Sequence, residues 1–158
     1  MKKIIVILLL YLSMIPTLYA VDRNYYFENF SVQDGLSQST VNAILQDKEG
    51  FLWFGTKDGL NRYDGQVFRQ YKFNSADPYS LGNNFVTSLY EDVEGNIWVG
   101  TDVGLYIYHP DKEVFEHFGK VSQEGTRIER SVSTILGGAD RCVWIACLLY
   151  TSPSPRDS

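Results

Sequence analysis

The chain has 158 residues, of which 44% are hydrophobic and 15% aromatic, and its 14 basic and 19 acidic side chains give a formal net charge of −5. An acidic chain is a poor ligand for nucleic acid, because binding to phosphates depends on lysine and arginine. The composition therefore argues against a nucleic-acid partner for this region.

Residues 1–20 have the pattern of a secretory signal peptide. Two lysines follow the initiating Met, residues 4–12 form an apolar run, and Pro16 and Ala20 mark the cleavage end. The run is much shorter than the roughly 20 apolar residues that a membrane anchor needs. We expect export to the periplasm with cleavage after Ala20, and an uncleaved anchor is the alternative.

Residues 21–40 are predicted to contain an outer strand and its lead-in to the first repeat. An aromatic-x-x-aromatic pattern precedes each predicted inner strand, in the pairs Phe27 and Phe30, Phe68 and Tyr71, and Phe115 and Phe118. In a closed ring of sheets, an N-terminal strand of this kind completes the last blade. An open solenoid would instead have a polar cap at this point.

Two segments, residues 41–63 and 86–108, are copies of one pattern. The second begins 45 residues after the first, and a damaged third copy over residues 132–146 follows at an offset of 46. A fixed period of this length is typical of an array of identical supersecondary units. The shared positions are Asp47, Gly50, Trp53, Gly55, Thr56, Gly59, Leu60 and Tyr63, then Asp92, Gly95, Trp98, Gly100, Thr101, Gly104, Leu105 and Tyr108, and finally Trp144.

Each unit is predicted to form four β-strands, because Gly and Asp interrupt its short apolar runs too often for helices. In the first unit we expect strands at residues 41–47, 51–56, 60–63 and 67–73. The last two are joined by an Asp-Gly dipeptide, which suits a type I′ hairpin turn.

The predicted fold is all-β, a partial β-propeller preceded by a signal-peptide helix. Residues 41–73 and 86–118 are expected to be two four-stranded antiparallel blades that pack face to face, and residues 132–146 an incomplete third. Trp53 and Trp98 are expected to be buried between neighbouring sheets. Propellers use about four to eight blades to protect their sheet edges, so two blades alone should be unstable or aggregate.

The residues shared by the copies are interpreted as scaffold. Trp fills the space between sheets, Gly allows close approach, and Thr satisfies turn donors. Asp47 and Asp92 recur at one place, which favours a turn role over a catalytic pair. Sites are usually built on what varies, so the ligand-binding residues stay unassigned, and the variable loops at 74–84 and 119–130 do not reveal the ligand.

The sequence assigns no catalytic residue, cofactor or metal ligand. Motifs of hydrolases, zinc proteases and phosphate loops are absent from it. His109 and His117 lack partners at metal-ligand spacing and are predicted to be solvated turn residues. Cys142 and Cys147, if they lie on one strand, would be about 16 Å apart, too far for a disulfide.

The pattern D-x-x-G-x-[IL]-W-[FV]-G-T-x-x-G-L-x-x-Y resembles the repeat of two-component regulator propellers, over residues 25 to about 146. Residues 30–41 also look like the usual start of their sensor region. The resemblance implies a periplasmic propeller that senses carbohydrate breakdown products, with an oligosaccharide or small molecule as ligand. It further implies a homodimer that signals through a membrane helix to a histidine kinase, in parts outside this chain.

Two other functions stay open. An exported propeller enzyme acting on glycans, of lyase or hydrolase type, would need acidic, Tyr or Arg side chains at the central channel. The inner strands offer mainly Asn42, Gln46, Thr87 and Glu91 there. A protein-binding scaffold of the WD type would need a Trp-Asp signature that the repeats lack. A downstream membrane helix and kinase in the intact gene would favour the sensor.

The repeat pattern stops after Ala146, where Thr, two residues, Gly and Leu should follow. Residues 147–158 look instead like the translation of a sequencing adapter. We therefore expect this tail not to be native, and genomic sequence across this point to restore Thr, Gly, Leu and further repeats. The alternative is a disordered polar tail rich in Ser and Pro.

Overall fold

The computed structural model describes residues 25–119 and 128–148. The predicted signal peptide and most of the predicted tail therefore lie outside the described residues. Within the described part, no helix is long and apolar enough to cross a membrane.

The described chain folds into three antiparallel sheets, which confirms the all-β prediction. The first blade contains β1 (Val41–Gln46), β2 (Leu52–Thr56), β3 (Gly59–Tyr63) and β4 (Phe68–Tyr71), paired in chain order. The second contains β5 (Val86–Glu91), β6 (Ile97–Thr101), β7 (Leu105–His109) and β8 (Val114–His117), paired in the same way. The third sheet is the hairpin β9 (Val132–Gly137) and β10 (Val143–Cys147).

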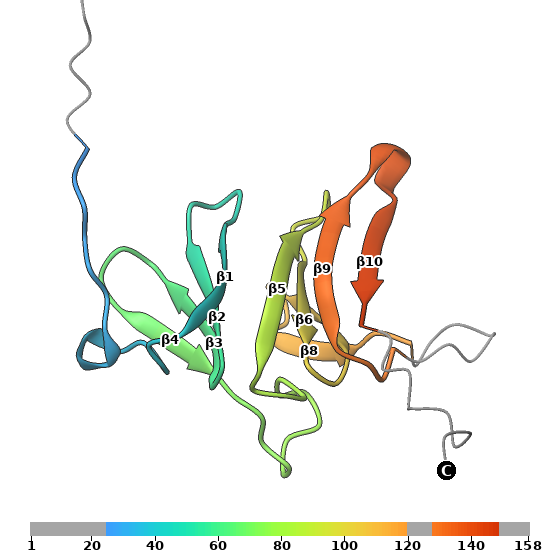
Figure 1. Ribbon diagram of the computed structural model, residues 1–158, viewed down its shortest axis with the longest axis horizontal. Coiled ribbons are helices and arrows are strands. Elements are labelled where there is room, and N and C mark those ends of the chain that lie inside the picture. The colour runs from blue at the N-terminus through green and yellow to red at the C-terminus, as the bar shows by residue number, and fades with distance from the viewer. Residues whose placement is uncertain (1–24, 120–127, 149–158) are drawn as a thin grey trace, which may run out of the picture.

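The sheets stand side by side, with β1 next to β5 and β5 next to β9 (Figure 1). This is the arrangement of propeller blades around an axis, in which the first strand of every blade is innermost. The turn after each inner strand lies at one end of the blades, and the connection between β4 and β5 lies at the other end (Figure 1).

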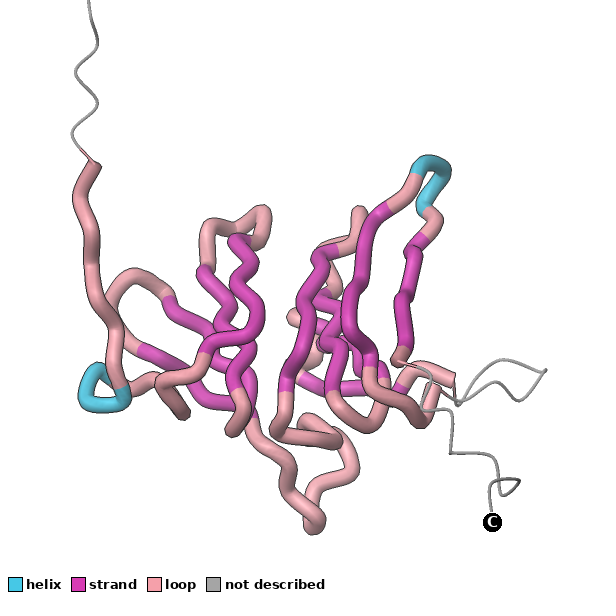
Figure 2. The backbone as a smooth tube through the Cα atoms, viewed as in Figure 1, coloured by secondary structure: helices cyan, strands magenta, loops and turns pink. Residues whose placement is uncertain are grey.

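The outer strand expected within residues 21–40 is not formed in the part that the structure describes. Residues 25–40 are irregular except for a 3₁₀ turn at Val32–Asp34 (Figure 2). An outer strand pairs with the third strand of a blade. In the two complete blades these third strands, β3 and β7, already pair with β4 and β8. The second aromatic residue of the pattern nevertheless packs in equivalent places before the two blades. Phe30 packs on Tyr63 and Phe68, as Tyr71 packs on Tyr108 and Phe115.

The main hydrophobic core lies between the two complete blades. Trp53 is 1% exposed and contacts the rings of Tyr71 and Tyr108, while Leu81 from the connection is fully buried. The other buried members are Leu60, Val86, Ile97, Val99, Tyr106 and Phe115. This core therefore combines contacts within a blade, such as Trp53 with Tyr71, and contacts between blades, such as Trp53 with Tyr108.

Close approach of the blades depends on a glycine in each second strand. A Cβ on Gly55 would lie 2.5 Å from Val86 of β5, and one on Gly100 would lie 2.9 Å from Val132 of β9. These distances are too short for real atoms, so only glycine lets the next inner strand pack at this point.

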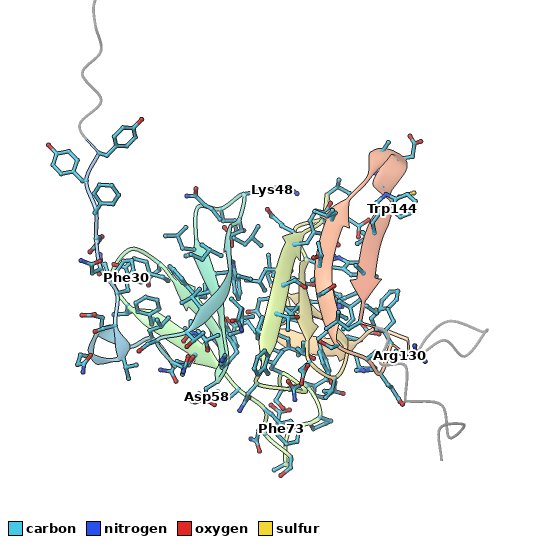
Figure 3. All side chains as sticks on the ribbon, viewed as in Figure 1. Phe30, Lys48, Asp58, Phe73, Arg130 and Trp144 are labelled. Carbon is cyan, nitrogen blue, oxygen red and sulfur yellow. The ribbon has the colours of Figure 1, made fainter. Side chains whose placement is uncertain are left out.

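The interface between the second blade and the hairpin is less complete. Val132, Ile135 and Leu105 are buried there, and Trp98 contacts Phe118 but is only half-buried. Trp98 is thus less buried than expected, because the described third sheet has two strands instead of four. Trp144 of β10 is 68% exposed (Figure 3).

The boundary of the predicted tail falls inside this hairpin. Cys147 is still part of β10, and the backbone N–H of Leu148 donates to the carbonyl of Ser131 at 2.9 Å. Cys142 lies just before β10, and both cysteines are free thiols.

Candidate functional site

The recurring aspartates hold the turn after each inner strand and also bind the recurring tryptophan. The carboxylate of Asp47 accepts the backbone N–H groups of Glu49 and Phe51, at 3.1 and 2.9 Å, and the indole N–H of Trp53 at 2.7 Å. This leaves the carboxylate fully engaged in the scaffold. The indole bond was not predicted, although the constant spacing of six residues between Asp and Trp in both copies is a signal for it.

Asp92 repeats this geometry in the second blade. It accepts the backbone N–H groups of Glu94 and Asn96 and the indole N–H of Trp98, each at 2.9 Å. Burial opposes ionisation of this carboxyl, but the hydrogen bonds from Trp98, Asn96 and Glu94 outweigh it and hold the pKa of Asp92 below its ordinary value. A carboxylate held ionised in this way is a structural acceptor and a poor general acid.

The β9–β10 hairpin lacks the hydrogen bond between an aspartate and the tryptophan. With the offset of 46 residues, Gly138 stands where the second blade has Asp92, so it offers Trp144 no carboxylate. A Cβ added to Gly138 would lie 2.5 Å from the indole nitrogen of Trp144. The two groups are therefore adjacent, as in the blades, but without the hydrogen bond.

The inner-strand polar residues link the blades instead of forming a separate group. Asn42 donates its amide N–H to the carbonyl of Val86 at 2.8 Å, and the Thr87 hydroxyl donates to the carbonyl of Val132. Glu91 accepts the backbone N–H of Lys48 at 3.1 Å. The fourth, Gln46, donates weakly to a turn carbonyl at 3.4 Å. Three of these hydrogen bonds join neighbouring blades and the fourth lies in a turn. These side chains therefore give little support to the hypothesis of an enzyme acting on glycans.

The predicted turn histidines are more constrained than expected. His109 is half-buried, with Nδ1 2.9 Å from the Asn96 amide oxygen and Nε2 3.3 Å from the Glu116 carboxylate. His117 packs edge-on against the Tyr106 ring at 4.9 Å. The prediction of solvated residues is wrong for His109, because the turn brings two polar partners to its ring. In the described ranges, 25–119 and 128–148, no three His, Cys, Asp or Glu side chains cluster to hold a metal.

The turn end of the blades carries a charged cleft of about 220 Å³. The Arg62 guanidinium lies 4.6 Å from the centre of the Phe51 ring, and the Lys48 ammonium donates to the carbonyl of Asp92 at 2.6 Å. Glu49, Glu91 and Glu94 line the same cleft. Across the blade boundary the Lys48 ammonium lies 3.9 Å from the Glu91 carboxylate, so this cleft contains an exposed ion pair between the two blades.

A second cleft, of about 480 Å³, lies at the opposite end, where the connection between the blades crosses β7 and β8. The sequence marked this connection only as variable. Phe73, on the connection, is labelled in Figure 3. The size is within the range of small-molecule sites.

The shared positions not yet described lie in turns and in the core. Gly50 and Gly95 adopt positive φ of 95° and 88° in the turns after the inner strands. The hydroxyls of Thr56 and Thr101 donate to the carbonyls of Gly59 and Gly104, both at 2.9 Å. Leu60, Leu105 and Tyr108 are fully buried, and Tyr63 is half-buried.

Comparison with known proteins identifies the repeat. The two-component regulator propeller family matches residues 35–58 and 80–103. A histidine kinase, P4, of Formosa agariphila is 49% identical over 65 residues, which are 41% of this chain and 5% of the kinase.

Solved structures agree with this match. The extracellular domain of a putative hybrid two-component system from B. thetaiotaomicron has a TM-score of 0.67 and 30% identity, over 77% of this chain and 18% of that one. A second such domain from the same organism has a TM-score of 0.56 and 26% identity, over 68% and 15%.

The chain thus spans only a small part of the relatives that it matches. The two similar structures described above are extracellular domains of putative hybrid two-component systems, in agreement with the expectation that this region is not an enzyme. The two blades with their repeated Asp–Trp turns thus match the two-component regulator propeller family at residues 35–58 and 80–103.

Proposed function

We propose that this region is the ligand-sensing propeller of a periplasmic, carbohydrate-responsive two-component regulator. The observation that carries the proposal is the likeness, over 77% of the chain, to the extracellular domain of a putative hybrid two-component system. The geometry supports binding over chemistry, since Asp47, Asp92 and the inner-strand polar groups are used to hold turns and join blades.

The proposed mechanism is a change of equilibrium between two arrangements of a homodimer. A ligand can shift such an equilibrium only by binding one arrangement more tightly than the other. Rigid blades suit this role, because interlocked sheets transmit a displacement instead of absorbing it. The signal would then cross the inner membrane to a histidine kinase domain outside this chain.

Calorimetry on the complete extracellular region of the protein tests the proposal. We expect saturable binding of an oligosaccharide, with the same saccharide recovered unchanged after prolonged incubation. Steady release of a shorter product by the purified region would show an enzyme instead. Failure of every glycan to bind, with a well-folded sample, would contradict carbohydrate sensing.

A further inference from the structure

The connection between the blades contains an insertion relative to the lead-in of the first blade. Phe30 and Tyr71 pack equivalently on their neighbouring blades, and Leu36 and Leu81 are both buried, at 2% and 0% exposure. Six residue steps separate Phe30 from Leu36, but ten separate Tyr71 from Leu81. The second connection is therefore longer by four residues.

The extra residues form an ordered loop. The Ser80 hydroxyl donates to the carbonyls of Asn74 and Asp77, at 3.0 and 2.8 Å, and the Asp77 carboxylate accepts the backbone N–H of Tyr79 at 2.9 Å. The backbone of Phe115 in β8 donates to the carbonyl of Tyr79 at 2.9 Å. A loop fixed by its own bonds presents a preorganised surface, which lowers the entropic cost of binding.

This longer loop opens the cleft of about 480 Å³, which we call the insertion cleft. In the first blade the same place is closed. The lead-in lies directly on β4, where Gln70 donates to the carbonyl of Gly35 at 2.8 Å and a Cβ on Gly35 would lie 3.3 Å from Phe68. The lead-in of the first blade thus lacks the insertion cleft that the connection between β4 and β5 forms.

The lining of the insertion cleft combines aromatic faces with polar groups. The rings of Phe73 and Tyr79 are 54% and 62% exposed, and both belong to the lining. Tyr106 lines it from β7, seated so closely over Gly82 that a Cβ there would lie 2.3 Å from the Tyr106 hydroxyl. Burial raises the pKa of Tyr106, so its hydroxyl keeps its proton at neutral pH.

The charges of the lining indicate which ligands suit it. Asp77 contributes a carboxylate and His117, paired with Tyr106 across the strands, an imidazole, and none of the described lining residues is a lysine or arginine. Anionic ligands would meet like charge there. A neutral sugar instead offers apolar ring faces for the aromatic side chains and hydroxyls for the Asp77 carboxylate and the Tyr106 phenol.

We propose that the insertion cleft binds a neutral oligosaccharide, with Tyr79 and Phe73 as stacking surfaces and Tyr106 and Asp77 as hydrogen-bonding partners. This inference rests on the proposed sensor function and assigns its ligand to one connection of the propeller. Gly82 is the residue that leaves room for the Tyr106 ring.

The test is calorimetry of the complete extracellular region with cellopentaose, xylopentaose, mannopentaose and laminaripentaose as neutral probes, and with trigalacturonate and a heparin tetrasaccharide as anionic ones. We expect a neutral probe to bind. Tyr79→Ala should weaken that binding about tenfold through loss of stacking, and Tyr106→Phe about fivefold through loss of one hydrogen bond. Tyr26→Ala, which removes a ring that is 92% exposed and outside the lining, is the matched control and should change affinity less than about twofold.

Circular dichroism melting keeps a folding defect separate, and Tyr106→Phe retains the buried ring. Equal affinity of the wild type and both variants for a neutral probe would place the site elsewhere, while the sensor function would stand. Binding of anionic probes alone would overturn the ligand class. Binding of none of the six would overturn this proposal together with carbohydrate sensing.

Discussion

Trp53 and Trp144 occupy the same position of the repeat and have opposite environments. Trp53 is 1% exposed, because the second blade covers it, whereas Trp144 is 68% exposed on the outer face of the hairpin (Figure 3). Trp98 lies between these extremes. The comparison shows that full burial of the tryptophan needs a neighbouring blade in addition to contacts within its own. Stability in such an array comes from interfaces between neighbours, as in other repeat proteins.

Substituting each of the two tryptophans in turn should give the largest difference in the free energy of unfolding. Trp53→Ala should lower the free energy of unfolding by about 3–5 kcal/mol, because it empties the centre of the core between the blades. Trp144→Ala should change it by less than about 0.5 kcal/mol, the range of surface substitutions. Urea denaturation of the chain, followed by circular dichroism, measures both. Equal losses would mean that the tryptophans act within their own sheets.

Substituting the glycine of a second strand should lower the free energy of unfolding by a smaller amount. Gly55→Ala places a Cβ 2.5 Å from Val86 and should cost about 1–3 kcal/mol by overpacking. Ala146 is the counterpart in the hairpin and is exposed. Ala146→Gly should therefore cost only about 0.5 kcal/mol of backbone entropy. Thermal melting of both variants is the measurement, and a harmless Gly55→Ala would show that the blades can separate at this point without loss.

The Asp–Trp turn should show a pH dependence. The pKa of Asp92 is lowered on folding, so its ionised form stabilises the folded state above the unfolded pKa near 4, and this contribution disappears as the pH falls through the folded value. Asp92→Asn should cost about 1 kcal/mol at pH 7 and flatten the decline below about pH 4. Denaturation at pH 7, 5, 4 and 3 tests this. An unchanged pH profile in the variant would assign the acid sensitivity to other carboxylates.

Restoring the missing aspartate should give the smallest effect. Gly138→Asp would supply Trp144 with an acceptor, at a position with extended backbone that aspartate tolerates. The exposed Trp144 side chain can move to accommodate the new Cβ, so a gain of about 0.5–1 kcal/mol is expected. Hydrogen exchange of the amides of β9 and β10 reports it. Gly138→Ala is the control, since it adds the Cβ without the carboxylate and should give no added protection.

Much of the fold could be predicted from local pattern. The spacing of Gly and Asp placed the strands to within two residues at their ends, as with 51–56 against Leu52–Thr56 and 67–73 against Phe68–Tyr71. Repetition also made Asp47 and Asp92 recognisable as turn residues. Leu36 and Leu81 were overlooked as core residues, although they too are 45 positions apart, because each is a single apolar residue within a polar connection.

The sequence by itself determined the strand order, the turn positions and the identity of the repeat, because these depend on contacts between residues close in the chain. Only the tertiary structure decided how deeply each tryptophan is buried, that residues 25–40 form no strand, and that the connection between β4 and β5 frames a cleft with β7 and β8. These features depend on which sheet lies opposite, and a local pattern does not record the distance between neighbouring sheets.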